Sequence, residues 1–267
     1  MNNANDEINK FKQKIKEKEQ SIYVTLTDPH TNQKINFTVK NDATIWRGRT
    51  LLTKEPITID WIKSFKKNSV FYDIGANMGV YSLYAAISSK VRVYAFEPES
   101  NNFQTFMENI IINHQQDNIL AFPLGISNQT ELTKLHLSEF ASASAHHTVG
   151  ESALDHGSLE KINTKYRQGI FSTTLDDLHA KWNLPLPDYI KIDVDGIEHK
   201  IIEGCNKILK NKKLSSLLIE INENRKEDLS IIKKLKKFNF NFDKEQVDKS
   251  RRKDGPHKGY AEYLFYK

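Results

Sequence analysis

The segment around Asp73 carries the first pattern in this sequence that could do chemistry. Asp73 stands near the end of an apolar run that predicts a β-strand, and Gly75, Asn77 and Gly79 follow in the turn that should lead into a helix. Glycine allows a tight turn and a close approach of the backbone to a ligand, and parallel sheets bind ligands at the carboxyl ends of their strands. The pattern therefore predicts a small-molecule site that combines backbone amides with a carboxylate.

A second carboxylate, Glu97, ends the next predicted strand, 22 residues after Gly75. A glutamate in this position can accept hydrogen bonds from both hydroxyls of a ribose. A nicotinamide dinucleotide would call for glycine where this chain has Asn77, and the G-x-x-x-x-G-K-[ST] pattern of a P-loop does not occur. We therefore expect a nucleoside cofactor, and the ammonium and carboxylate of S-adenosylmethionine suit the acid and the amides of this turn.

Two further aspartates, Asp193 and Asp195, follow another predicted strand and should lie at the same edge of the sheet. Asp193 could orient an acceptor hydroxyl or remove its proton, while Asp195, Glu198 and His199 could complete an acidic site or hold a divalent cation. The same side chains could instead cap the next helix or favour its dipole. Because no H-E-x-x-H motif occurs, the sequence leaves a divalent metal undecided.

Residues 125–173 form a polar stretch in which we predict only one strand, Leu132–Leu137. Long irregular segments within α/β domains are often lids or substrate-binding loops. Ser144, His146 and His147 lie in this stretch and are candidates for binding an acceptor, or for acting as a base. The alternative is that they are solvated loop residues.

These candidates need a sheet that brings them to one edge. The chain from residue 68 alternates short apolar runs with helical patterns, which predicts a Rossmann-like, doubly wound and mostly parallel sheet over 68–267 with an insertion at about 125–173. The predicted strands are Val70–Ile74, Val91–Phe96, Ile119–Pro123, Leu132–Leu137, Tyr189–Asp193, Leu214–Ile221 and, at a sheet edge, Tyr260–Tyr266. The predicted helices are Val80–Ser88, Asn101–Asn113, Leu175–Trp182, Ile197–Leu209 and Asp228–Phe238.

Residues 1–67 are predicted to form an N-terminal cap of a helix and a β-hairpin. Residues 1–20 suit an exposed helix or a frayed arm and leave a homodimer contact open. The runs Ser21–Leu26 and Ile35–Val39 are β-prone and flank a turn-forming segment. Trp61, Ile62 and Phe65 fit the inner face of a short helix.

Composition narrows the class of protein. The 267 residues include one cysteine, which excludes an internal disulfide framework and fits a reducing, cytoplasmic compartment. No run approaches the ~20 apolar residues of a membrane span, so we expect no membrane association. The net charge of +5 is dispersed, and no N-P-P-[YF], helix-turn-helix or zinc motif accompanies it. Nucleic acid is therefore an unlikely partner.

With these pieces in order, the chain resembles the FkbM family of methyltransferases over about residues 69–222. The resemblance is carried by FYDIGANMGVYSLYAA, VYAFEPESNNFQTFMENI and DYIKIDVDGIEHKIIEG, with Leu175–Leu178 and Leu218–Ile221 also in order. It implies a class I methyltransferase fold and transfer of a methyl group from S-adenosylmethionine to an oxygen. The acceptor would commonly be a hydroxyl of a sugar, such as a nucleotide-linked sugar or a surface-polysaccharide precursor.

The resemblance also assigns roles by position. It implies donor binding by Asp73, Gly75, Asn77, Gly79, Glu97, Asn101 and Ser127. The family signature has glutamate where this chain has Asp195, a shorter acid at the same position. Methylation of another small molecule or of nucleic acid, and donor binding without catalysis, remain the alternative functions.

Overall fold

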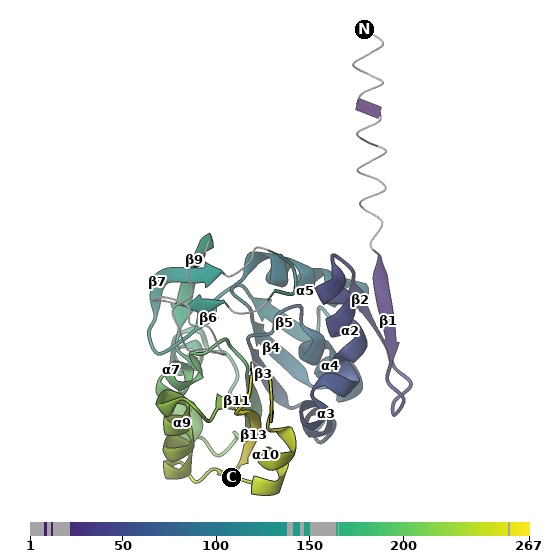
Figure 1. The fold of residues 1–267 in the computed structure, drawn as a ribbon. Coiled ribbons are helices and arrows are strands. Elements are labelled where there is room, and N and C mark those ends of the chain that lie inside the picture. Colours follow the sequence, from purple (N-terminus) through teal and green to yellow (C-terminus); the bar gives the residue numbers. More distant parts are fainter. Residues whose placement is uncertain are drawn as a thin grey trace.

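A central seven-stranded sheet organises the computed structural model (Figure 1). Its order is β12-β13-β11-β10-β3-β4-β5, and the strands from β11 to β5 are parallel, whereas β13 is antiparallel to both of its neighbours. The strand bounds are β3 Val70–Ile74, β4 Arg92–Phe96, β5 Ile119–Phe122, β10 Tyr189–Ile192, β11 Ser216–Asn222, β12 Asn241–Phe242 and β13 Tyr260–Tyr266. The structure describes residues 8, 9, 12, 22–137, 141–144, 147–149, 164, 166–255 and 257–267.

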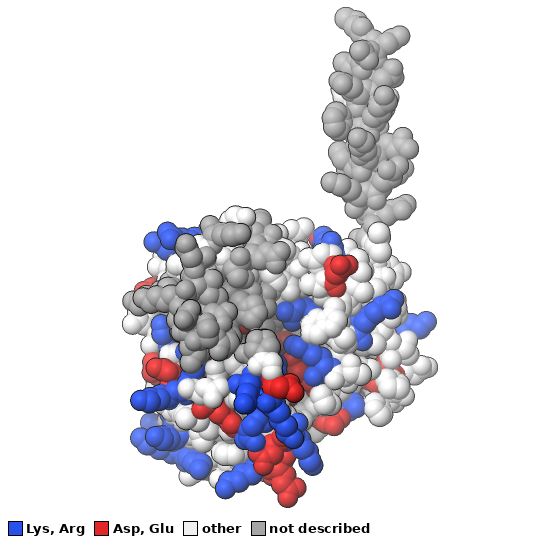
Figure 2. Space-filling view, viewed as in Figure 1, with Lys and Arg blue, Asp and Glu red and all other residues white. Residues whose placement is uncertain are grey.

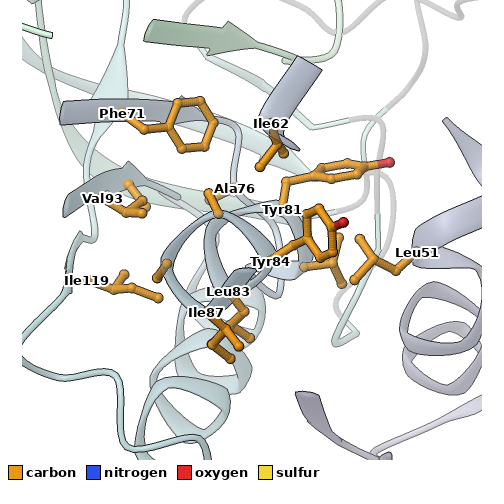
Figure 3. Packing of buried hydrophobic residues seen from close by; sticks show 14 of the residues in the cluster. Leu51, Ile62, Phe71, Ala76, Tyr81, Leu83, Tyr84, Ile87, Val93 and Ile119 are labelled. Atoms are coloured by element: carbon orange, nitrogen blue, oxygen red, sulfur yellow. The ribbon is translucent and has the colours of Figure 1, made fainter. Parts of the chain in front are cut away.

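Helices cover both faces of this sheet, so β3 and β10 are buried along their whole length. One face carries α2 Asp42–Lys54, α3 Pro56–Lys63, α4 Val80–Ser88 and α5 Ser100–Ile112. The other carries α6 Leu175–Trp182, α7 Glu198–Glu203, α8 Asn206–Lys210 and α9 Lys226–Lys237, while α10 Lys244–Ser250 packs near β13. Helix α4 lies between the sheet and α2, with Phe71 and Val93 of the sheet on one side of it and Leu51 of α2 on the other, where Tyr84 lies (Figure 3). The predicted Rossmann-like fold is therefore confirmed.

The N-terminal hairpin joins this core. Strands β1 Tyr23–Thr27 and β2 Lys34–Thr38 pair antiparallel as predicted. Ile35 and Phe37 are fully buried in the same cluster as α4, and the backbone N–H of Thr38 donates to Asn109 Oδ1 of α5 at 2.7 Å. Helix α2 was not predicted. The predicted arm at residues 1–20 lies almost entirely outside the described residues.

The segment 125–173 contains more order than the sequence indicated. Strands β6 Gly125–Ile126, β9 Tyr166–Thr173, β7 Glu131–Leu137 and β8 Thr148–Val149 form, in that spatial order, a second sheet. The prediction of a strand near Leu132–Leu137 is confirmed, but the expectation of an otherwise irregular segment was wrong. The sequence of β9 alternates weakly, and its pairing with β7 is a long-range contact that local pattern does not encode.

Two further predictions need correction. The helix expected over Ile197–Leu209 is two short helices, α7 and α8, which are separated at Gly204 and Cys205. A Cβ on Gly204 would lie 2.5 Å from the backbone oxygen of Ser127, so this break lets the chain pass close to β6. Tyr260–Tyr266 is a strand as predicted, but β12 lies outside it and forms the edge.

Candidate active site

A cavity of about 670 Å³ lies at the carboxyl ends of β3, β4 and β10. This is where the strand order reverses, because β4 follows β3 on one side and β10 lies on the other, and such switch points are the usual ligand sites of α/β sheets. Its volume suits a small-molecule ligand. We call the lining residues Gly75, Asn77, Glu97, Asn102 and Asp195 the Glu97 side, and Trp46, Arg47, Lys54, Glu55, Asp193, Glu220 and Arg252 the Asp193 side.

The glycine turn after β3 is shaped by close packing. Gly75 has φ +80°, and a Cβ there would lie 1.9 Å from the backbone oxygen of Asp193. Gly79, also at φ +80°, would place a Cβ 2.0 Å from the ring of Phe106. Gly75 and Asn77 line the cavity, whereas Gly79 begins α4 and packs against α5. The turn therefore contributes Gly75 and Asn77, but not Gly79, to the wall of the cavity.

Glu97 is the buried acid of the Glu97 side, with 6% of its surface exposed. One carboxylate oxygen accepts the N–H of Asn77 at 2.8 Å and the other accepts the N–H of Glu99 at 2.9 Å. Burial raises the pKa of Glu97 to about 7, although these two hydrogen bonds favour its charged form. Each oxygen keeps acceptor capacity for a ligand, because a carboxylate offers about four lone-pair directions.

The remaining predicted donor-binding residues lie outside the cavity lining. Asp73 is 1% exposed and accepts a hydrogen bond from Ser82 Oγ of α4 at 2.6 Å, and burial raises its pKa. Asn101 donates to Glu99 Oε1 at 3.0 Å. Ser127 continues from β6, where its N–H donates to the backbone oxygen of Thr173. The structure thus brings together Gly75, Asn77 and Glu97 of the predicted set.

Asn102, which sequence reasoning missed, completes the Glu97 side. Its Nδ2 donates to the backbone oxygen of Ser144 at 3.2 Å, and Asn77 Nδ2 donates to the same oxygen at 2.8 Å. Asn102 Oδ1 is buried and has no hydrogen-bond partner within the described part of the chain. A buried acceptor without a partner is costly, so this atom is a candidate ligand contact.

Ser144 and His147, two of the candidates for acceptor binding, both line the cavity, whereas His146 lies outside the described residues. Ser144 Oγ and His147 Nε2 are 2.8 Å apart. The backbone N–H of His147 donates to Asp195 Oδ2 at 3.0 Å. Ser144 and His147 therefore lie against the Glu97 side, where Asn77, Asn102 and Asp195 bind their backbone.

Asp193, whose side chain is partly exposed to the cavity, forms an ion pair with the buried Lys191. Lys191 is 2% exposed, its Nζ lies 2.5 Å from Asp193 Oδ2, and it sits 4.8 Å from the centre of the Tyr81 ring. Burial would raise the pKa of Asp193, but the positive charges of Lys191 and Lys54 outweigh it and hold the pKa well below its usual range. Asp193 is therefore ionised at neutral pH and is a weak proton acceptor.

Glu220 of β11 also lies on the Asp193 side, and its pKa is shifted in the opposite direction to that of Asp193. Burial and the negative charge of Asp193 raise the pKa of Glu220 to about 8, although Arg252 Nη2 donates to its Oε1 at 2.8 Å. Two neighbouring carboxyl groups with separated pKa values can divide the roles of proton acceptor and permanent anion. Glu220 was not among the residues selected from the sequence.

His199 lies on α7, away from the cavity lining. Its neighbours instead hold the loop that carries Asp195. The N–H of Gly196 donates to Glu198 Oε1 at 3.3 Å, and Arg225 Nη1 donates to the backbone oxygen of Gly196 at 3.0 Å. Arg225 also lies 3.6 Å from Asp228 Oδ1, so a buried set of charged side chains supports this loop.

The outer wall of the cavity comes mainly from α2 and from the residues that follow it. Trp46 is 50% exposed and lies beside Lys54, whose Nζ is 5.7 Å from the indole centre. Lys54 Nζ also pairs with Glu55 at 2.7 Å. Sequence reasoning missed this wall because it did not predict α2, although Asn41 and Thr44 cap the helix reciprocally and were a usable start signal.

Neither a metal site nor a membrane span is found in the described part of the chain. No group of three or more His, Cys, Asp and Glu side chains there is arranged to hold a metal ion. None of its helices is both long enough and apolar enough to cross a membrane.

The strand order, the antiparallel β13 and the cavity at the switch point define a Rossmann-like α/β fold with a ligand site at the carboxyl edge of its sheet. The chain belongs to the FkbM family of methyltransferases, because the FkbM methyltransferase domain matches residues 73–242. It is therefore an enzyme, and the resemblance found in the sequence is confirmed.

Individual relatives are more distant. The chain is 24% identical over 185 residues, 69% of each chain, to the hexuronic acid methyltransferase AglP of Haloferax volcanii. The crystal structure of an FkbM methyltransferase from Methylobacillus flagellatus KT has a TM-score of 0.49 and 16% identity, covering 85% of this chain and 56% of that one. TYW2 of P. horikoshii in complex with MeSAdo has a TM-score of 0.45 and 13% identity, covering 92% and 70%.

Proposed function

We propose that this enzyme transfers the methyl group of S-adenosylmethionine to a hydroxyl oxygen of a saccharide, such as a nucleotide-linked sugar or a surface-polysaccharide precursor. The observation that carries the acceptor class is Trp46, a half-exposed indole on the wall of a cavity that also contains carboxylates. A sugar ring presents C–H faces that pack on an aromatic ring and hydroxyls that bond to carboxylates. The likeness to a hexuronic acid methyltransferase supports the same class.

The Glu97 side fits the donor. Glu97 would accept hydrogen bonds from the ribose hydroxyls, as its free acceptor capacity and its position at the end of β4 allow. Gly75 and Asn77 would border the rest of the molecule, and the unpartnered Oδ1 of Asn102 is available for a donor group. When bound, S-adenosylmethionine would supply a methyl carbon activated by its sulfonium.

The Asp193 side would prepare the acceptor. The hydroxyl oxygen forms a bond to the methyl carbon as the carbon–sulfur bond breaks, and the hydroxyl proton passes to a base. Asp193, held ionised by Lys191, would accept the hydrogen bond that orients the hydroxyl. Glu220, with a pKa of about 8, is matched to neutral pH as the proton acceptor, once it is in its ionised form.

Radiolabelled S-adenosylmethionine, incubated separately with a panel of nucleotide sugars, with RNA and with protein, tests this proposal. We expect label in one or more sugars, at least 100-fold slower transfer in Asp193→Asn, and a loss of about 10²–10⁴-fold in Glu220→Gln, the usual contribution of a general base. Calorimetry with S-adenosylhomocysteine should give both variants a donor-product affinity within threefold of wild type. Label in RNA or protein but in no sugar would contradict the acceptor class, and wild-type turnover in Asp193→Asn would remove that residue from the mechanism.

A further inference from the structure

Almost all of the charged side chains on the Asp193 side form ion pairs, either with one another or with the buried Lys191 beneath them. Asp193 pairs with Lys191, Glu55 with Lys54, and Glu220 with Arg252, each at 2.8 Å or less. Arg47 is the cation of this lining for which no carboxylate lies within ion-pair distance in the described part of the chain. Asp254 also lines the cavity, but it is exposed and therefore hydrated.

The guanidinium of Arg47 is nevertheless held in a defined orientation. Its Nε donates to the backbone oxygen of Ala143 at 3.0 Å, and Asn41 at the start of the same helix donates to the backbone oxygen of Ser142 at 2.9 Å. Its two terminal nitrogens make no hydrogen bond to the described residues. A guanidinium fixed through Nε presents these nitrogens as a fork, which matches the paired oxygens of a carboxylate or a phosphate.

The position of Arg47 makes this fork available to a ligand. Arg47 lies one residue after Trp46 and seven before Lys54 on α2, and all three line the cavity. Its charge is also felt by Asp193, because Arg47 is among the groups that lower the pKa of that carboxyl. An anion bound at Arg47 would therefore lie in the same cavity as the group that orients the acceptor hydroxyl.

We propose that Arg47 forms an anion subsite that binds a carboxylate or phosphate group on the acceptor, so that the enzyme selects acidic over neutral sugars. The proposal rests on the proposed function, because it assumes a saccharide acceptor. The anion would pair with Arg47 while the sugar ring packs against Trp46. Lys54 is already paired with Glu55, and Arg252 already donates to Glu220, so these two cations have fewer free donors to offer an anion than Arg47.

Three matched probes test the subsite by calorimetry on the full chain saturated with S-adenosylhomocysteine. They are 4-nitrophenyl β-glucoside, the corresponding β-glucuronide, and the corresponding β-glucoside 6-phosphate. We expect wild type to bind one or both acidic probes at least tenfold more tightly than the glucoside, and the stronger of the two identifies carboxylate or phosphate as the preferred group. In Arg47→Gln this preference should fall below twofold, and Arg47→Lys should keep an intermediate preference because it retains the charge but not the fork.

Arg49→Gln is the matched control, because Arg49 lies on the same helix but is exposed and does not line the cavity. It should keep the wild-type preference, and all variants should keep their affinity for S-adenosylhomocysteine within threefold, which reports an intact fold. Equal binding of the three probes, no binding of either acidic probe, or a preference that survives in Arg47→Gln would overturn the subsite.

Methyl transfer to the panel of nucleotide sugars is a separate readout. Transfer to sugars without any anion preference would overturn the subsite and leave the proposed function intact. An Arg47-dependent anion preference without transfer to any sugar would contradict the proposed function and leave the subsite standing.

Discussion

Burial of Glu97 raises the pKa of its carboxyl group and so links its protonation to ligand binding. Its carboxyl group is buried at the end of β4 and has a pKa of about 7, so about half of it is protonated at neutral pH before a ligand binds. Two ribose hydroxyls would donate to the ionised form and favour it. Donor affinity should therefore depend on the pH of the solution.

We expect the affinity for donor ligands to be constant above pH 8 and to fall about tenfold per pH unit below pH 6, because binding must then displace a proton. Glu97→Gln should bind about 10–100-fold more weakly at pH 8, from the loss of hydrogen bonds worth about 1.5–3 kcal/mol, and should show no such pH dependence. Calorimetry with 5′-methylthioadenosine measures this without interference from an amino-acid group. A wild-type affinity that is flat from pH 5.5 to 8 would contradict ribose binding by ionised Glu97.

Whether a site residue could be predicted from the sequence depended on how close in the chain its partners lie. Gly75, Asn77 and Glu97 lie in continuous strand-to-turn segments, so their spacing alone predicts that they meet. Lys191 and Asp193 are two residues apart at the end of a strand, where alternate side chains share a face, and this spacing could have indicated their pair. Arg47, Glu220 and Arg252 are separated by about 30 residues or more, and only the tertiary fold brings them together.

Among the secondary-structure elements, β10 and α7 are joined by a loop whose backbone is held in place by side chains from outside the loop. Arg225 donates to the backbone oxygen of Gly196, Glu198 accepts from the N–H of the same residue, and Gly196 has φ +99°. Arg225 is 8% exposed and also neutralises the buried Asp228. It therefore both positions the loop of Asp193 and Asp195 and satisfies a buried charge.

These two roles of Arg225 can be separated experimentally. Arg225→Met should lower the free energy of unfolding by about 3 kcal/mol, because it leaves a buried carboxylate without its cation, and should lower kcat at least tenfold. Adding Asp228→Asn should recover much of the stability but not the kcat, because the hydrogen bond to Gly196 is still missing. Urea denaturation and steady-state kinetics measure the two effects.

Arg251→Met is the control for this prediction, since Arg251 forms a partly exposed pair with Glu223 outside the cavity. It should change stability by about 1 kcal/mol or less and leave kcat unchanged. Recovery of kcat together with stability in the double variant would show that Arg225 acts on the loop only through the overall fold.

Helices and strands differed in how well the sequence predicted them. Strand β3 and helices α4 and α6 begin and end as predicted, because compact apolar runs and clear turns delimit them. Helix α2 was missed because Gly48 and three threonines weaken its helical pattern. Close packing favours glycine at this position, since a Cβ on Gly48 would lie 3.0 Å from the ring of Phe37.

For the whole molecule, the alternation of strands and helices predicted the doubly wound, mostly parallel sheet, although not the order of its strands, whereas the surface charge gave little information. On the face shown in Figure 2, basic and acidic side chains are interspersed, with a dense group of both toward the bottom, where the C-terminal segment lies in Figure 1. A net charge of +5 distributed in this way does not identify a partner. The informative charges are the few that line the cavity.

The short segment 141–144 touches both ends of that cavity. Its backbone oxygens accept from Asn41 and Arg47 on the side of α2, and from Asn77 and Asn102 on the side of Glu97. A ligand that orders this segment from one end should therefore prepare it for a ligand at the other, which would make binding of the two substrates cooperative. By thermodynamic reciprocity, S-adenosylhomocysteine and an acceptor sugar should each tighten the other's binding by the same factor, and affinities that are independent of each other would show that the segment does not couple them.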